Sequence, residues 1–146
     1  MTQTPAPRTG HRSVTVQRLA PGEFEIVSER GGRVVTTSGG TETSLTPVEL
    51  LLGAIGACTA MDVDAPTARR SEPDEFVVAV SANKVRDDLG NHLTDITVTL
   101  RVRFPDTEAG EAATAILPDI ARRSHERLCT VSRTVETGTP ISTTLD

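Results

Sequence analysis

A run of apolar and small residues, Leu50 to Met61, constrains the fold of this chain more than any other feature. Before it, Thr46 is a good N-cap, Pro47 suits the first helical position and Glu49 completes a capping box, so we expect a helix to begin here. Because the run has almost no polar face, we expect this helix to be buried all round. We also expect it to falter just before Pro66. Four small residues would let another backbone pass close by: Gly53, Ala54, Gly56 and Ala57.

Segments on both sides of this helix show the alternation and the turn residues of antiparallel strands. Three short strands are predicted to form a meander, at residues 11–19, 24–28 and 33–37. They are separated by turns at Pro21-Gly22 and Gly31-Gly32. Residues 76–85 and 92–104 predict a long hairpin with Gly90 in its turn. The second arm alternates apolar residues with Thr, Arg and Asp, which indicates a half-buried strand.

The last part of the chain predicts two more helices and a strand. Glu108–Arg127 has the pattern of an amphipathic helix that Pro118 kinks or splits. Its buried stripe is expected at Ala112, Ile116, Ile120 and Leu128. Residues 130–136 predict a short helix and residues 140–145 a terminal strand. The order of elements indicates an α+β protein, with a single domain over residues 11–146 after a disordered leader at residues 1–10.

Composition excludes several classes of function. The 146 residues include 15 basic and 20 acidic side chains, for a formal net charge of −5, and neither Tyr nor Trp. Nucleic-acid binding is not expected, because it needs a basic face and stacking rings. The apolar run Leu50–Cys58 is too short to span a bilayer. The polar N-terminus shows no secretory signal, so we expect a cytoplasmic protein with no membrane partner. Any pocket must be lined mainly by aliphatic side chains.

The two cysteines, Cys58 and Cys129, are far apart in the sequence. Their spacing excludes a Cys-x-x-Cys redox motif and a compact zinc site. Each fits the pattern of a small buried hydrophobe. The alternative is a pair that meets in space, where one thiolate attacks a substrate and the other resolves the product as a disulfide.

Residues 46–63, which run from Thr-Pro-Val-Glu to Cys-Thr-Ala-Met-Asp-Val, resemble the signature helix of the OsmC/Ohr family of osmotically inducible and organic hydroperoxide resistance proteins. Cys129-Thr130-Val131-Ser132 resembles the second cysteine motif of that family. The residues of these motifs are most similar to those of an OsmC-like branch of the family. The resemblance implies an intertwined homodimer, with two antiparallel sheets around long buried helices. A partner subunit would then share the burial of a helix that has no polar face.

The resemblance also implies a chemistry. In that family the helix cysteine attacks the O–O bond of an organic hydroperoxide, and the resulting sulfenic acid condenses with the second cysteine. An external dithiol, often on a lipoyl protein, reduces the disulfide. For this chain the resemblance makes Cys58 the nucleophile and Cys129 the resolving cysteine. It implies a small apolar hydroperoxide as substrate, and we expect neither a bound cofactor nor a metal.

The family also keeps an Arg and a Glu beside the first cysteine, which hold the thiolate and position the peroxide. Arg18, near the end of the first predicted strand, is our candidate for the Arg, because a permanent cation offsets the effect of burial on a thiol. Two other arginines are rivals for this role: Arg12 and Arg30. Glu49 is the candidate for the Glu. It lies nine positions before Cys58, whereas the hydroperoxide resistance branch has its Glu ten before, where this chain has Val48.

Three other side chains have weaker claims. His125 precedes Cys129 by four residues, so the two share a face if the helix continues that far. It would then tune the thiol or bind a metal; otherwise it is a plain surface histidine. Asp62 and Asp64 follow the cysteine helix, and suit either a metal site or simple solvation.

Three hypotheses follow. The first is a thiol peroxidase of oxidative-stress defence, working through a Cys58–Cys129 disulfide cycle. The second is a small-ligand-binding or scaffold protein that uses an apolar pocket without turnover. The third is a hydrolase or thiol-transfer enzyme that uses Cys58 alone. Close approach of the two cysteines favours the first hypothesis, and wide separation favours the others.

Overall fold

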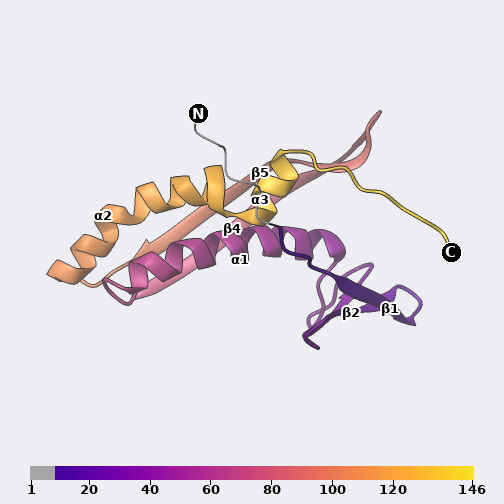
Figure 1. The fold of residues 1–146 in the computed structure, drawn as a ribbon, viewed down its shortest axis with the longest axis horizontal. Coiled ribbons are helices and arrows are strands. Elements are labelled where there is room, and N and C mark those ends of the chain that lie inside the picture. Colours follow the sequence, from indigo (N-terminus) through magenta and orange to yellow (C-terminus); the bar gives the residue numbers. More distant parts are fainter. Residues whose placement is uncertain (1–8) are drawn as a thin grey trace. The chain divides into compact units, whose positions relative to one another are not determined.

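The computed structural model describes residues 9–146. Its backbone contacts divide the chain into an N-terminal unit that ends at Leu50 and a C-terminal unit, Leu51–Asp146. Figure 1 shows the helices and strands of each unit. The predicted disordered leader lies mostly outside the described residues, and a single domain over residues 11–146 stays a prediction.

The N-terminal unit is built around the predicted meander. Strands β1 (Val14–Ala20), β2 (Glu23–Ser28) and β3 (Arg33–Thr37) form an antiparallel sheet in the order β1-β2-β3. The expected turns join them, and Gly22 and Gly31 adopt φ values of 72° and 88°, which favour glycine.

Helix α1 (Pro47–Ala68) begins where the sequence predicts. The capping box is present: Thr46 N donates to Glu49 Oε2 at 2.7 Å, and Glu49 N donates to Thr46 Oγ1 at 3.2 Å. The expected break before Pro66 is wrong, because the helix continues to Ala68. Pro66 lies in the last turn, where the proline costs only one internal hydrogen bond. Thr67 Oγ1 donates to the carbonyl of Val63 at 2.8 Å in the same turn.

Within the described chain α1 is buried along one stripe, not all round as expected. The buried positions are Ile55, Gly56, Thr59, Val63 and Thr67. On other faces Leu51 is 39% exposed and Met61 is 72% exposed. One chain covers only one side of the helix, so an apolar sequence alone does not determine how many sides are covered.

Strands β4 (Glu75–Asp87) and β5 (Gly90–Arg103) form a second, two-stranded antiparallel sheet. Asp87 pairs with Gly90 at the turn, where Gly90 has φ 92°. This is the predicted hairpin with a tighter turn: β4 extends past its predicted range at both ends, and β5 begins two residues earlier and ends one residue earlier than predicted. The predicted alternation is confirmed, because Ile96, Val98, Leu100 and Val102 are half-buried while the residues between them are exposed. The hairpin lies against α1 at Gly56, where a Cβ would come within 2.9 Å of Val80 Cγ2.

Helix α2 (Glu108–Arg123) continues through Pro118, so the predicted split there is wrong. The helical geometry changes later, at a π-helical turn, η1 (Ser124–Leu128). The buried stripe is also displaced from the predicted one. Gly110, Ala113 and Ser124 are buried, Ile116 and Ile120 are half-buried, and Ala112 and Leu128 are exposed. Gly110 packs directly against the preceding loop, because a Cβ there would lie 1.8 Å from the Pro105 carbonyl oxygen.

Helix α3 (Thr130–Glu136) matches the predicted short helix. The predicted terminal strand at residues 140–145 is wrong: this segment has no regular structure, and Ile141 and Leu145 are 93% and 97% exposed. No strand of the described chain pairs with it, and an isolated apolar alternation does not form a strand alone. Within residues 9–146 no helix has the length and apolarity needed to cross a membrane.

Candidate active site

The C-terminal unit brings Cys58 and Cys129 together. Cys58 lies on α1, and Asp62 follows it by four residues, one turn further along the same side of the helix. Cys129 lies at the junction of η1 and α3. The two Sγ atoms and an Asp62 carboxylate oxygen all lie within 4.8 Å of one another. Both cysteines are free thiols.

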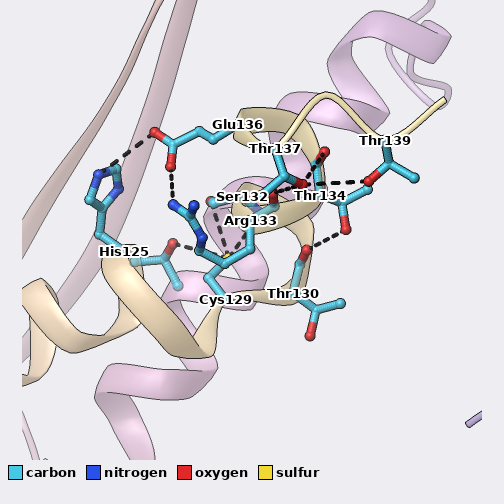
Figure 2. A network of polar contacts seen from close by, with 10 residues as sticks. His125, Cys129, Thr130, Ser132, Arg133, Thr134, Glu136, Thr137 and Thr139 are labelled. Carbon is cyan, nitrogen blue, oxygen red and sulfur yellow. Dashed lines mark hydrogen bonds and ion pairs between the residues drawn. The ribbon is translucent and has the colours of Figure 1, made fainter. Parts of the chain in front are cut away.

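The local fold around Cys129 holds its side chain in place (Figure 2). Cys129 is the N-cap of α3, and its backbone N–H donates to the Ser124 carbonyl at 2.9 Å. Its Sγ accepts from the Ser132 backbone N–H at 3.4 Å and lies 3.1 Å from Ser132 Oγ. Thr59 Oγ1 donates to the same sulfur at 3.9 Å. Cys129 is fully buried, so these contacts replace water around the thiol.

The two thiols have different electrostatic surroundings. Burial raises the pKa of the Cys58 thiol, and the neighbouring Cys129 and Asp62 raise it further, against one hydrogen bond from the Val131 backbone. Burial acts on Cys129 in the same direction, but hydrogen bonds from Ser132, Cys58 and Thr59 outweigh it and lower the pKa of that thiol. Within this unit the better-stabilised thiolate is therefore that of Cys129.

Asp62 is fixed by a residue that the sequence did not suggest. Ser124, fully buried at the start of η1, donates from Oγ to Asp62 Oδ2 at 2.8 Å. Because a buried hydroxyl needs a hydrogen-bond partner, this contact holds the carboxylate beside the two sulfurs.

A pocket of about 410 Å³ adjoins the cysteine network within the C-terminal unit. Thr59 and Ser132, which both contact Cys129 Sγ, line it. Its aliphatic lining is Ile55, Ile96, Val98, Leu100, Ala121 and Val135. The expected aliphatic character is therefore present. The sequence did not suggest its polar lining, which is Thr59, Thr97, His125, Ser132 and Glu136.

His125 does not share a face with the Cys129 thiol. Figure 2 shows its ring directed toward Glu136, with His125 Nε2 3.7 Å from Glu136 Oε1. The π-helical turn explains the difference, because it changes the angular spacing that an α-helix would give residues four apart.

Arg18 and Glu49 both lie in the N-terminal unit and are exposed. Arg18 is on β1, and Glu49 forms the capping box of α1. The site within the C-terminal unit therefore does not include them, and their part in catalysis stays a prediction. The rivals Arg12 and Arg30 are also in the N-terminal unit.

Sequence reasoning missed Thr59, Ser124 and Ser132. One of them could have been found from the sequence. Ser132 follows Cys129 by three residues, which is the spacing between an N-cap residue and the backbone N–H that donates to its side chain. Ser124 had none, because its contact with Asp62 joins residues far apart in the chain.

Comparisons with known proteins agree with this architecture. The family model for OsmC-like proteins matches residues 39–144. An uncharacterized protein of Mycobacterium tuberculosis (strain H37Rv) is 32% identical over 128 residues, covering 87% of this chain and 90% of the relative. An OsmC-like protein of unknown function from Vibrio cholerae has a TM-score of 0.71 at 14% identity, covering 88% of this chain and 95% of that chain. An organic hydroperoxide resistance protein from Elizabethkingia anophelis has a TM-score of 0.56 at 14% identity, covering 88% of this chain and 91% of that chain.

The solved structures confirm the predicted fold, a mixed α+β arrangement with antiparallel sheets. The matched region contains both cysteine motifs, Cys58 on its helix and Cys129 before α3. This chain belongs to the OsmC-like protein family.

Proposed function

We propose that the protein is a cysteine-based thiol peroxidase that reduces organic hydroperoxides. The observation that carries the proposal is the approach of two free thiols from distant parts of the chain, with their sulfurs within 4.8 Å. That approach lets a modest side-chain movement bring the sulfurs to the bond length of a disulfide, about 2 Å.

The two thiols have complementary accessibility. Cys58 is partly exposed and Cys129 is fully buried. A hydroperoxide reaches Cys58 more readily, so we assign Cys58 as the nucleophile and Cys129 as the resolving cysteine.

The chemistry proceeds in two steps. Cys58 Sγ attacks one oxygen of the O–O bond; that bond breaks, the alkoxide leaves and takes up a proton, and the sulfur becomes a sulfenic acid. Cys129 Sγ then attacks Cys58 Sγ, an S–S bond forms, and hydroxide leaves as water after protonation. Together two thiols and one hydroperoxide give a disulfide, an alcohol and water. An external dithiol or lipoyl protein then returns two electrons.

The substrate class follows from the pocket beside the site. Its mostly aliphatic lining and its size suit a small apolar group. The Elizabethkingia neighbour, named as an organic hydroperoxide resistance protein, supports the same class of substrate.

Further parts of the proposal extend beyond the C-terminal unit. Arg18 and Glu49 are proposed to position the peroxide, and the chain is proposed to act as a homodimer. The exposed apolar residues Leu51 and Met61 on α1 support a second subunit. A cytoplasmic location is proposed because both thiols must be reduced at the start of each cycle.

The deciding experiment is an anaerobic thiol titration of the reduced protein, before and after one equivalent of cumene hydroperoxide. We expect two thiols to disappear per chain, and a dithiol to restore both. No loss of thiols would reject the peroxidase. It would favour the second candidate, binding of a small apolar ligand without turnover, which the 410 Å³ pocket also accommodates.

A further inference from the structure

The cysteine pair has a third neighbour that the peroxidase cycle does not use. Asp62 brings a carboxylate oxygen within 4.8 Å of both sulfurs. Two thiolates and a carboxylate would place three negative charges in a small volume. Among residues 9–146, no Lys, Arg or His forms an ion pair with Asp62. Within the C-terminal unit, the cluster therefore has no cation paired with its carboxylate.

We propose that the reduced protein binds a thiophilic divalent cation, with Zn²⁺ as the best match, through Cys58, Cys129 and Asp62. Thiolate sulfur and carboxylate oxygen are both ordinary zinc ligands. Sulfurs that share one tetrahedral zinc are roughly 3.7 Å apart, as follows from Zn–S bonds of about 2.3 Å. The observed cluster meets this geometry after small side-chain adjustments.

Two features prepare the site for a metal. Ser124 Oγ donates to Asp62 Oδ2 at 2.8 Å, which orients the carboxylate as outer partners of metal ligands do. The Ser132 backbone N–H donates to Cys129 Sγ at 3.4 Å, which stabilises the sulfur in its anionic form. Both contacts are provided by elements of the C-terminal unit, so the site is built before a metal arrives.

The ligand set determines the metal and its coordination. Two sulfur ligands favour Zn²⁺ over the hard cations Mg²⁺ and Ca²⁺, which take oxygen ligands. Three protein ligands leave the fourth tetrahedral position for water. When Zn²⁺ binds to the neutral thiols, two protons leave and two Zn–S bonds form, with no change of oxidation state. The metal uses the sulfur lone pairs that a disulfide would use, so the bound state and the disulfide exclude each other.

The test is a binding measurement on the reduced full-length chain under anaerobic conditions. Zn²⁺ affinity is measured by competition with a chromophoric chelator, and Co²⁺ is used as a spectroscopic probe. We expect one metal per chain and a near-ultraviolet thiolate-to-cobalt charge-transfer band. Mg²⁺ at the same concentration should not compete. These readouts do not require catalysis, so the inference stands or fails separately from the proposed peroxidase.

Variants locate the site. Cys58→Ser, Cys129→Ser and Asp62→Asn should each weaken Zn²⁺ binding by at least the roughly 10–100-fold that loss of an outer partner costs. Asp64→Asn is the matched control, because Asp64 is an exposed carboxylate two residues further along the same helix. If a cysteine variant does not fold, judged by circular dichroism, the Asp62→Asn and Asp64→Asn pair still decides. The proposal is overturned by wild-type protein that binds no metal, or by equal affinities in Asp62→Asn and Asp64→Asn.

Discussion

Ser124 Oγ donates a 2.8 Å hydrogen bond to Asp62 Oδ2 and so joins the start of η1 to the cysteine-bearing helix α1. Ser124 has no exposed surface, whereas Asp62 is half-buried. This bond fixes the distance between the helix that carries Cys58 and the turn that leads to Cys129. A residue that takes no part in the chemistry therefore links the two elements that carry the thiols.

Ser124→Ala is expected to lower the free energy of unfolding by about 1.5–3 kcal/mol, the range for a hydrogen bond to a charged group. Urea denaturation followed by circular dichroism measures the change. Ser142→Ala, in the exposed C-terminal segment, is the control and should stay within about 0.5 kcal/mol of wild type. Equal stability of the two variants would mean that the Ser124–Asp62 bond does not hold the elements together.

Gly56 and Gly53 offer a matched test of how α1 packs. A Cβ at Gly56 would lie 2.9 Å from Val80 Cγ2, whereas a Cβ at Gly53 would meet nothing within 4 Å. Gly56→Ala should therefore cost about 1–3 kcal/mol of stability through overpacking. Gly53→Ala should be neutral or stabilising by up to about 1 kcal/mol, because Ala is the better helix former. Thermal unfolding compares them, and a Gly56→Ala variant as stable as Gly53→Ala would contradict the packing.

The sequence was sufficient to predict the helices and strands that are determined by neighbouring residues in the chain. Thr46 and Glu49 satisfy each other's backbone N–H groups within one turn, so the start of α1 could be predicted. The alternation of β5 could be predicted as well, because one face of the hairpin is half-buried. The terminal strand could not, because a strand needs a neighbour that sequence alternation does not supply.

The site was less accessible to sequence reasoning. Spacing alone left the cysteines either as buried hydrophobes or as a reactive pair, and resemblance to a family favoured the pair. Ser124 and Thr59 act through contacts across 62 and 70 residues. Such contacts arise from packing, which local patterns do not encode. The split predicted at Pro118 was wrong, because a proline inside a helix weakens it locally but does not determine where the helix ends.

Single-cysteine variants separate the roles proposed for the two thiols. Cys58→Ser should abolish consumption of cumene hydroperoxide, because it removes the proposed nucleophile. Cys129→Ser should consume about one equivalent and then stop, because the sulfenic acid has no resolving partner. Peroxide loss measured by a ferrous-xylenol orange assay, with the sulfenic acid trapped by dimedone, distinguishes these outcomes. Sustained turnover by Cys58→Ser would exclude this order of events.

Glu49 has a structural contact and a proposed catalytic role, which a conservative variant separates. Glu49→Gln keeps the capping box, since Gln serves in that motif, so stability should not change. Peroxidase activity should fall, because the carboxylate charge is lost. Thr46→Ala removes the N-cap side chain, so it should lower the free energy of unfolding by about 1 kcal/mol. It should leave the activity of the folded protein unchanged. Full activity in Glu49→Gln would limit this residue to capping the helix.

The open side of α1 predicts the assembly of the protein. Met61 is 72% exposed on a helix whose residues from Leu50 to Met61 are almost all apolar or small, and water would contact this surface in an isolated chain. Because such surfaces usually mark an interface, we expect a dimer in sedimentation velocity at micromolar concentration. Met61→Glu should shift the protein toward monomer, since dimerisation would then bury an unpaired charge. Leu145→Glu is the control, because Leu145 is 97% exposed in a segment without regular structure. A monomeric wild type, or equal dissociation of both variants, would show that this face of α1 is not covered by a second copy.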